Sequence, residues 1–453
     1  ENIIKPACLQ GFWHGGGSES LSVERVCKTI HQYNKKPVSP GDMEKLLAIA
    51  KDCQKVKNYV YERFGGIGGL AKLYPGYTVQ NEMTRSGLRA ELGLPSVYFY
   101  LAIFDALGDI KSQWTRTKSK LFRLIAKNEE MTEEEKHYLR FLLKVNNAFE
   151  AVLNQHSIVL PGDMQRQYEA LTEAVDVEKM HRYLCRQVRK YHGKQHTDSA
   201  NGFSLSMKAY RYENGGVYIA TKEKRKRIFI PLTDKNQYDS QIYLKLYPQE
   251  HRVEIKVPVQ VKVREYGEYS GQVGAAFGMI VMLTTDEGHV YGERLGDYLA
   301  EYGEWVREQS KNYNRNRKEN PGRKKYRAKK ERYEEGLHSY INHELNLFLQ
   351  TEKPKCIYLP KLPGTGKAGI NKKINHAAAI WPRGYIRSRI MQKCRENSVK
   401  VVEVLGKDIS RECSICGVIG EKQKGLFHCP NCGYQTEEKT NTARNAKKRG
   451  MGV

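Results

Sequence analysis

The spacing of apolar residues changes twice along the chain. From Met43 onward, apolar positions recur at steps of three and four residues, which places them on one face of a helix. Ser39-Pro40-Gly41-Asp42 is a suitable start signal for the first of these helices. Further helices are expected through Tyr98–Phe104, Ile110–Lys127 and Leu139–Phe149. The pattern predicts a helical region over residues 43–200.

Strand periodicity follows the helical region. Apolar residues occupy every second position from Val253 to Val263, as in a half-buried β-strand. Arg227–Leu232 and Ile242–Leu246 have the composition of neighbouring strands. Residues 201–270 are therefore predicted to form a small antiparallel β domain. The first 42 residues are ambiguous, with a loop expected at Gly15–Ser18 and room for one strand before it.

A third pattern begins near Gln272. An apolar run from Val273 to Leu283 precedes a predicted hairpin, and long helices then alternate with short strands near Lys355–Leu359 and Val401–Leu405. Alternation of strands and helices is typical of an α/β domain. The chain is therefore expected to be multidomain, with α+β and α/β parts.

Four of the ten cysteines form two matched pairs. Cys413-x-x-Cys416 is separated by twelve residues from Cys429-x-x-Cys432, and a glycine follows the second cysteine of each pair. Four thiolates at this spacing converge on one tetrahedral Zn²⁺ with no open position. Residues 411–435 are predicted to be a ribbon with a structural zinc. The six scattered cysteines are interpreted as small buried apolar residues of a protein in a reducing cytoplasm.

Charge narrows the choice of partner. The 453 residues contain 76 Lys and Arg but 51 Asp and Glu, a formal net charge of +25. Such a surplus favours a polyanionic partner. Hydrophobic residues make up 40% of the chain, which excludes wholesale disorder. No apolar run is long enough for a membrane span, and the printed N-terminus lacks a signal-peptide pattern.

The basic residues gather in clusters, and many of the 29 tyrosines stand beside them. Aromatic rings among cations are typical of nucleic-acid grooves, although a basic helix is often only a solvated surface. Charge alone does not distinguish RNA from DNA. The predicted nucleic-acid-binding residues are Arg116, Lys118, Lys120, Arg123, Arg225, Lys226, Arg227, Arg315, Arg317, Lys318, Arg323, Lys324, Lys325, Arg327, Lys329, Lys330, Arg444, Lys447 and Lys448.

The C-terminal half resembles the TnpB nucleases of insertion sequences and the miniature type V CRISPR effectors. The segments that carry the resemblance, in chain order, are Val273–Gly278, Gly336–Tyr340 with His338, Ile357–Leu362, Ser410–Gly417 and Asn441–Ala446. The resemblance implies a wedge β domain from 1–42 and 201–270, a recognition lobe at 43–200, a RuvC-like domain of RNase H type at 271–410, the ribbon at 411–435 and the end of the RuvC-like domain at 436–453. It also implies a guide RNA and a double-stranded DNA target as partners.

The sequence departs from this family at its three catalytic positions. RuvC-type cleavage uses two divalent metal ions held by carboxylates, and Mg²⁺ requires oxygen ligands. Ala276, Pro360 and Lys439 occupy the three carboxylate positions. A shift of one residue to Ala275, Leu359 or Thr440 does not restore a carboxylate. Asp286, Glu437 and Glu438 are the nearby substitutes. The sequence therefore predicts that the RuvC-like domain binds no Mg²⁺ and that the protein is not an enzyme.

Three functions remain open at this point. The first is an RNA-guided DNA-binding protein without nuclease activity, whose occupancy of DNA represses transcription or recruits RNA polymerase through a sigma factor. The second is an active RNA-guided endonuclease with displaced carboxylates, and the third is a zinc-ribbon DNA-binding protein without RNA. The resemblance allows a homodimer on one RNA, and it implies a prokaryotic cytoplasmic protein associated with the nucleoid.

Overall fold

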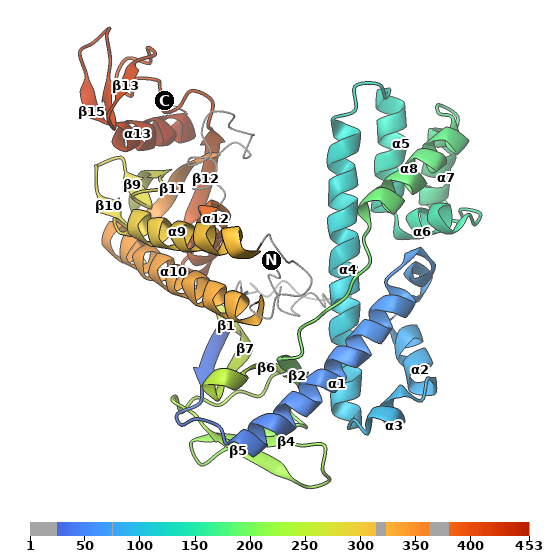
Figure 1. The fold of residues 1–453 in the computed structure, drawn as a ribbon. Helices are drawn as coiled ribbons and strands as arrows, with labels where there is room; N and C mark the ends of the chain where they lie inside the picture. Colours follow the sequence, from blue (N-terminus) through green and yellow to red (C-terminus); the bar gives the residue numbers. More distant parts are fainter. Residues whose placement is uncertain (1–24, 75, 314–322, 362–379, 453) are drawn as a thin grey trace. The chain divides into compact units, whose positions relative to one another are not determined.

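A computed structural model describes residues 25–74, 76–313, 323–361 and 380–452. The chain divides into two compact units (Figure 1), one formed by residues 27–259 and the other by residues 260–453. The predicted loop at Gly15–Ser18 lies outside the described residues. No helix among the described residues is both long enough and apolar enough to span a membrane.

Unit 1 contains most of the helices that the structure describes. The first, α1 (Pro40–Phe64), starts at the predicted signal, since the Ser39 side chain accepts a hydrogen bond from the Asp42 N–H. One continuous helix, α4 (Ser96–Ala126), replaces the two helices expected between Tyr98 and Lys127, because Gly108 lies between apolar residues that continue the same buried face. The remaining helices are α2 (Tyr77–Arg85), α3 (Leu88–Leu92), α5 (Glu133–Lys144), α6 (Asn146–Asn154), α7 (Gly162–Thr172) and α8 (Val177–Tyr191).

Two antiparallel sheets complete unit 1. The first has the order β1 (Arg25–Tyr33), β7 (Arg252–Lys262), β6 (Ile242–Tyr247) and β2 (Gly202–Leu205). The second has the order β3 (Tyr210–Glu213), β4 (Gly216–Ala220) and β5 (Arg227–Pro231). One continuous hydrophobic core joins helices and sheets, and the Tyr98 hydroxyl donates a hydrogen bond of 2.6 Å to the Ala220 carbonyl. The helices and the sheets are therefore parts of one compact unit.

Unit 2 contains a five-stranded mixed sheet. Its order is β10 (Val290–Tyr291), β9 (Leu283–Thr285), β8 (Gly271–Phe277), β11 (Pro354–Lys361) and β12 (Lys400–Leu405). Strands β8, β11 and β12 run parallel, whereas β9 is antiparallel to both of its neighbours. The helices α9 (Leu295–Tyr313), α10 (Arg323–Glu352) and α12 (Arg383–Glu396) cover one face, and α13 (Glu438–Met451) covers the other. This is the α/β layering that the sequence predicted.

A small three-stranded sheet precedes α13. Its strands are β13 (Glu421–Gln423), β14 (Leu426–His428) and β15 (Gln435–Glu437), all antiparallel. Phe427 on the central strand is fully buried against Cys413, Cys429 and Tyr434, which form a hydrophobic cluster of their own. The segment is too short to build a larger core, and small units of this kind usually need a metal ion or disulfides for stability.

Candidate metal centre and nucleic-acid interface

The four paired cysteines converge at one end of the small sheet. Their Sγ atoms all lie within 4.8 Å of one another, with 3.7 Å between Cys413 and Cys432 and 3.4 Å between Cys416 and Cys429. Both CxxC turns have the same backbone construction, in which the N–H of the glycine that follows donates to the carbonyl of the first cysteine. The glycines, Gly417 and Gly433, have φ of 77° and 71°, a conformation that favours residues without Cβ.

These four thiols fit a tetrahedral zinc ion. A Zn–S bond of about 2.3 Å in tetrahedral geometry separates the sulfur atoms by about 3.8 Å. The observed separations of 3.4 and 3.7 Å are close to that value. Cys413 and Cys429 are buried, whereas Cys416 and Cys432 lie at the surface. With four protein ligands, a bound zinc ion would stabilise the ribbon and leave no position for a substrate.

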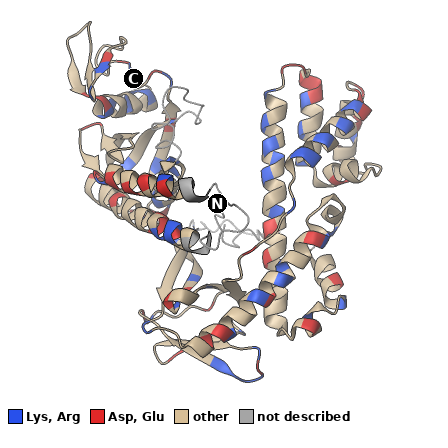
Figure 2. Cartoon of the chain, in the orientation of Figure 1, with Lys and Arg blue, Asp and Glu red and all other residues tan. Residues whose placement is uncertain are grey.

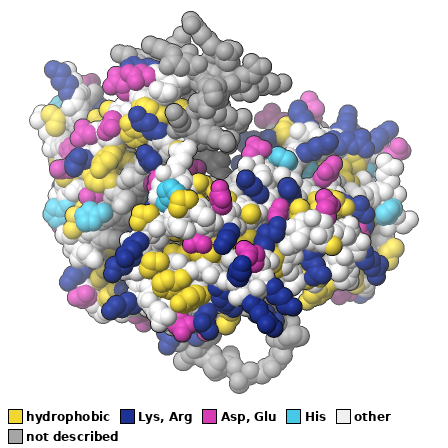
Figure 3. Space-filling model, turned by 60° about the horizontal axis from the view of Figure 1, so that its bottom comes forward, with side chains coloured by type: hydrophobic (Ala, Val, Ile, Leu, Met, Phe, Trp, Pro, Cys, Tyr) yellow, Lys and Arg dark blue, Asp and Glu magenta, His cyan; other side chains and the backbone are white. Residues whose placement is uncertain are grey.

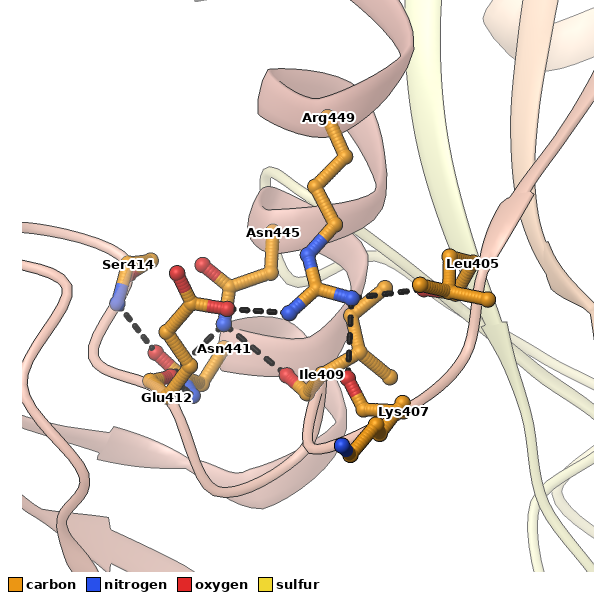
Figure 4. A network of polar contacts seen from close by, with 8 residues as sticks. All are labelled: Leu405, Lys407, Ile409, Glu412, Ser414, Asn441, Asn445 and Arg449. Carbon is orange, nitrogen blue, oxygen red and sulfur yellow. Dashed lines mark hydrogen bonds and ion pairs between the residues drawn. The ribbon is translucent and has the colours of Figure 1, made fainter.

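A polar network fixes the ribbon to α13 (Figure 4). Asn441, Asn445 and Arg449 are spaced four residues apart and therefore share one side of the helix. The Asn441 side chain accepts from the Ser414 N–H at 3.0 Å and donates to the Glu412 carbonyl at 2.7 Å. Asn445 donates to the same carbonyl at 2.6 Å and to that of Ile409 at 2.9 Å.

Arg449 completes this network. Its guanidinium donates to the backbone carbonyls of Leu405 and Lys407, at 2.6 and 2.9 Å, and pairs with the Glu412 carboxylate. The chain between β12 and the first cysteine is thus held along the whole length of α13. The four-residue spacing of these side chains could be seen in the sequence. The backbone carbonyls to which they donate could not.

The first two catalytic positions of the family lie on adjacent parallel strands. Register pairs Tyr358 of β11 with Gly274 of β8, and its continuation places Pro360 beside Ala276. Both residues are buried and lie on the face toward α13, because Gly274 on that face approaches the Ala443 carbonyl. Ala275 and Leu359 point to the opposite core. Ala276 and Pro360, and not their neighbours in sequence, therefore face α13.

Lys439, at the third position, lies in the first turn of α13, on the same side of the sheet. A Cβ placed on Gly278, two residues beyond Ala276, would lie 3.6 Å from Lys439 Cε. The lysine side chain thus extends along the end of β8. Among the described residues, no carboxylate pairs with Lys439, so its ammonium contributes an uncompensated positive charge here. A cation at this place opposes the binding of another cation.

Asp286, a buried carboxylate on the loop after β9, already has hydrogen-bond and ion-pair partners within unit 2. One carboxylate oxygen accepts from the Gly274 N–H at 2.9 Å, and the other lies 2.6 Å from Lys447 Nζ. Its backbone carbonyl accepts from Arg444 Nε at 2.8 Å. Both Lys447 and Arg444 were predicted to bind nucleic acid, but in this structure they hold the loop after β9 against α13.

The two glutamates at the start of α13 also have partners. Glu437 is exposed and accepts from the Thr440 hydroxyl at 3.1 Å. Glu438 pairs with Lys422 of the ribbon at 2.9 Å. Neither glutamate lies with Asp286 in a cluster of metal-binding groups, and the cysteines form the one such cluster detected among the described residues.

Lys and Arg residues recur along α4 (Figure 2). The predicted basic residues of this helix are mostly exposed, among them Arg116, Lys120 and Arg123, and Lys120 Nζ lies 3.9 Å from the centre of the Tyr191 ring of α8. Lys118 is half-buried and donates to Asn146 Oδ1 at 2.9 Å. Burial lowers the pKa of Lys118 to about 8, because the charged ammonium is less well solvated there.

Helix α8 adds cations that the sequence analysis did not single out. Arg182, Arg186, Arg189 and Lys190 are exposed, and their spacing places them on one side of this helix. The end of α8 is held beside α4, because the His192 ring stacks on Trp114 at 3.5 Å and its Nδ1 lies 3.2 Å from the Thr117 hydroxyl. We call the exposed cations of both helices the α4–α8 basic surface. The spacing in α8 could have revealed it, since Met180, Leu184 and Val188 mark the buried side.

The other predicted contacts are distributed over both units. Arg225, Lys226 and Arg227 are exposed at the β4–β5 hairpin, where Lys226 pairs with Glu223 at 2.5 Å. Lys448 is exposed on α13. Lys329 lies over the Trp305 ring at 5.6 Å, and Lys330 pairs with Glu334 at 3.5 Å. Arg323, Lys324, Lys325 and Arg327 belong to α10, and Arg315, Arg317 and Lys318 lie outside the described residues.

The histidine of the family resemblance lies in unit 2 between two helices. His338 of α10 stacks on Tyr385 of α12 with ring centres 3.6 Å apart. Burial lowers the pKa of His338, which favours the neutral ring.

The scattered cysteines form no disulfide among the described residues. Cys53, Cys356 and Cys394 are buried, Cys27 and Cys185 are half-buried, and Cys8 lies outside the described part.

The fold and the cysteine cluster define an α/β unit that carries a four-cysteine ribbon before its last helix. A known family model matches part of this unit. Residues 384–446 match the family model described as Cas12f1-like, TNB domain. This match covers α12, β12, the ribbon and most of α13.

A curated relative and two solved structures are also similar to the chain. The "TnpB-like protein aq_aa05" of Aquifex aeolicus (strain VF5) is 32% identical over 102 residues, which is 21% of this chain. The match spans about a third of that relative's length. The resemblance to TnpB-like proteins and miniature type V effectors is therefore confirmed.

The two solved structures are similar at low identity. "Cryo-EM structure of the Cas12f1-sgRNA-target DNA complex" superposes with a TM-score of 0.43 and 13% identity, over 93% of this chain and 99% of that one. "Cryo-EM structure of CRISPR-Cas12f Ternary Complex" gives a TM-score of 0.31 and 12% identity, over 93% and 98% of the two chains.

Proposed function

We propose that this protein is an RNA-guided DNA-binding protein that does not cut its target. The observation that carries the proposal is the chemistry of the face between β8, β11 and α13. Ala276 and Pro360 supply no metal ligand there, and Lys439 places an ammonium group at the end of β8. Two-metal cleavage needs several carboxylates around paired divalent ions.

The topology of unit 2 supports an RNase H-type domain of the RuvC kind. Numbered along the chain, its five strands have the spatial order 3-2-1-4-5, with only the second antiparallel to its neighbours. In this arrangement the first and fourth strands are central and parallel, which brings their side chains to the last helix. The three altered positions therefore lie near one another. A displaced active site has little support, because the Asp286 carboxylate already accepts from the Gly274 N–H and pairs with Lys447.

The charge and the family match support the nucleic-acid partners. The net charge of +25 and the α4–α8 basic surface suit a phosphate backbone. The Cas12f1-like domain and the TnpB-like relative suggest that the bound polyanions are a guide RNA and its double-stranded DNA target. In such complexes base pairing selects the sequence, while the protein binds the backbone and a short flanking motif. The four-cysteine ribbon, with a structural zinc, would contribute to the scaffold around them.

Copurification tests this proposal directly. The full-length protein is purified with its bound RNA, that RNA is sequenced, and DNA duplexes with and without the matching sequence are presented in Mg²⁺. We expect a shift of the matching duplex only, with both strands intact on a denaturing gel. Cleavage products would support the endonuclease alternative. An absence of bound RNA, with DNA binding retained, would support the zinc-ribbon binder instead.

Occupancy without cleavage suits a role in transcription. A protein held at a promoter by base pairing blocks RNA polymerase, and one held upstream of it can recruit polymerase through a sigma factor. Transcription in vitro from templates with the target at either position distinguishes these outputs by the direction of the change. Size-exclusion chromatography with light scattering of the RNA complex tests whether two copies share one RNA.

A further inference from the structure

The three-stranded sheet of unit 1 has one face in the core and one face in solvent. Its first turn is a two-residue hairpin at Asn214 and Gly215, whose φ angles of 54° and 70° are typical of a type I′ turn. Alternation then directs Val217 and Ile219 of β4 into the core, together with Ile228 and Ile230 of β5. The residues between them therefore face outward.

The outward face carries a row of one arginine and two aromatic rings. Register places Arg211 of β3 opposite Tyr218 of β4, and Tyr218 opposite Phe229 of β5. The Tyr218 and Phe229 rings lie 4.7 Å apart at 36°, and the Arg211 guanidinium lies 5.6 Å from the Tyr218 ring centre. We call these three residues the aromatic row.

The rings are held against the sheet but are not covered. A Cβ on Gly216 would come within 2.7 Å of the Phe229 ring, so glycine at this position lets the ring lie close to the backbone. Asn214 donates to the Tyr218 hydroxyl at 3.3 Å, which helps to fix that ring. Phe229 nevertheless remains 39% exposed, whereas phenylalanine is usually buried in folded proteins. Such a fixed, exposed ring suits stacking with a planar partner.

Positive charge lies beside the row. Arg227 faces outward on β5, and the loop before it exposes Lys224 and Arg225. The acidic residues close by are Glu213, which pairs with Arg211 at 2.6 Å, and Glu223, which pairs with Lys226. These pairs leave a surplus of cations at one end of the face. Figure 3, in which the bottom of Figure 1 comes forward, shows hydrophobic side chains among Lys and Arg side chains on this side of the molecule.

We propose that the aromatic row is a stacking site for an unpaired base of the bound RNA. A base would lie on the exposed Phe229 ring, and the phosphate that follows it would meet Arg227 and the β4–β5 loop. Aromatic stacking beside cations is how proteins hold unpaired nucleotides. In a DNA duplex the bases are stacked inside the helix and cannot reach such a surface, whereas the loops and bulges of a folded RNA can. The inference rests on the proposed function, since it requires that RNA is bound.

Crosslinking and binding test this site in the full-length protein. The probe is a 12-nucleotide unpaired RNA that contains 4-thiouridine, with a DNA duplex as a second ligand. Irradiation should attach the probe to the tryptic peptide Ile228–Lys235 or to Tyr212–Lys222. We expect Phe229→Ala to weaken RNA binding by about 5- to 100-fold, the range for loss of one stacked base, and Phe229→Trp to retain it. Tyr77→Ala, which removes a 68% exposed ring on α2, is the matched control.

The outcomes separate this inference from the proposed function. RNA affinity unchanged within twofold in Phe229→Ala and in a Tyr218→Ala, Phe229→Ala double variant would overturn the stacking site alone. A loss confined to the DNA duplex would overturn it too, as would crosslinks only in other peptides. If the unaltered protein binds no RNA, the proposed function itself fails. Circular dichroism of each variant shows whether the sheet is still folded.

Discussion

Asp286 illustrates how a buried carboxylate can serve the fold. Its side chain is almost fully buried, and its two oxygens are occupied by the Gly274 N–H and by Lys447. A buried carboxylate that lost this ammonium would have an uncompensated charge in a medium of low dielectric constant. The pair therefore joins β8, the loop after β9 and α13.

Asp286→Asn should destabilise unit 2. Because Lys447 is then left half-buried without its counter-charge, we expect the free energy of unfolding to fall by about 2 to 3 kcal/mol, less than for a fully enclosed pair since Lys447 reaches solvent. Urea unfolding with and without Mg²⁺ measures this. The exposed neighbour substitution Glu287→Gln is the control. Stabilisation of the unaltered protein by Mg²⁺ that vanishes in Asp286→Asn would instead assign Asp286 to a metal site.

Glu254 gives unit 1 a dependence on pH. Burial alone would raise its pKa, but hydrogen bonds from His31 and Tyr247 and the charge of Lys256 outweigh burial and lower the pKa to about 2. Because the folded value lies below the ordinary one, this contribution to stability is present above about pH 4.5 and is lost as pH falls toward 2. The expected loss is on the order of 2 to 3 kcal/mol.

Glu254→Gln should remove this dependence. We expect the variant to be less stable at pH 7 and to lose less stability than the unaltered protein between pH 5 and pH 2. Denaturant unfolding at several pH values, followed by circular dichroism, gives the comparison, with exposed Glu62→Gln as the control. Parallel pH curves for Glu254→Gln and the unaltered protein would contradict the assignment.

The cysteine spacing predicted the four residues that converge in the structure, whereas the contacts around α13 could not be predicted. Ala276, Pro360 and Lys439 could be located from the motifs, because each motif is local. Which face these residues occupy depends on the β8–β11 register and on the close approach of α13 to Gly274, and both arise from packing between distant segments. The engagement of Arg444 and Lys447 by Asp286 could not be predicted for the same reason.

Among the elements, the ribbon depends most on its ligand. Three short strands and one buried phenylalanine cannot supply a core, so a zinc ion bound by the four cysteines would provide most of the folding free energy. The Asn441, Asn445 and Arg449 network would hold the base of the ribbon even without metal. Loss of zinc should therefore unfold the tip of the ribbon and leave α13 in place.

Metal analysis checks this expectation. We expect one zinc per chain by plasma mass spectrometry, none after treatment with a strong chelator, and a large loss of zinc in Cys413→Ser. Cys185→Ser, which alters a half-buried cysteine in unit 1, should retain the metal. Hydrogen exchange after chelation should rise over β13–β15 and stay low in α13. A protein that keeps four reactive thiols and no zinc would contradict the ribbon assignment.

Helix α8 carries exposed cations that the sequence analysis did not single out. Its buried side follows the helical period, and its cations lie on the other side, next to those of α4. If this surface binds phosphates, Arg186→Gln with Arg189→Gln should reduce the slope of log affinity against log salt by about 1.5, or about 0.7 to 0.9 per lost contact. Arg85→Gln with Arg89→Gln removes two exposed charges from α2–α3 and should leave the slope unchanged. Equal slopes in both double variants would place the contacts elsewhere.

At the scale of the whole molecule, periodicity predicted the classes of structure but not how they combine. Helices, antiparallel strands and the α/β region all occur in the predicted order. The sequence did not show that the helices and both sheets of unit 1 share one core. That core depends on contacts between distant segments, such as the hydrogen bond from Tyr98 to Ala220. Helix α4 continues through Gly108, where the sequence analysis expected two helices, because a lone glycine lowers helix stability only modestly.

We expect lasting occupancy of DNA without strand scission, and a supercoiled plasmid reports both properties in one sample. The plasmid carries one site that matches the copurified RNA, and it is incubated with the complex in Mg²⁺ and then in Mn²⁺. Footprinting reports occupancy, and gel electrophoresis of the same samples reports nicks. We expect a protected site on a plasmid that stays supercoiled for hours. Nicked or linear plasmid that depends on the matching site would contradict it.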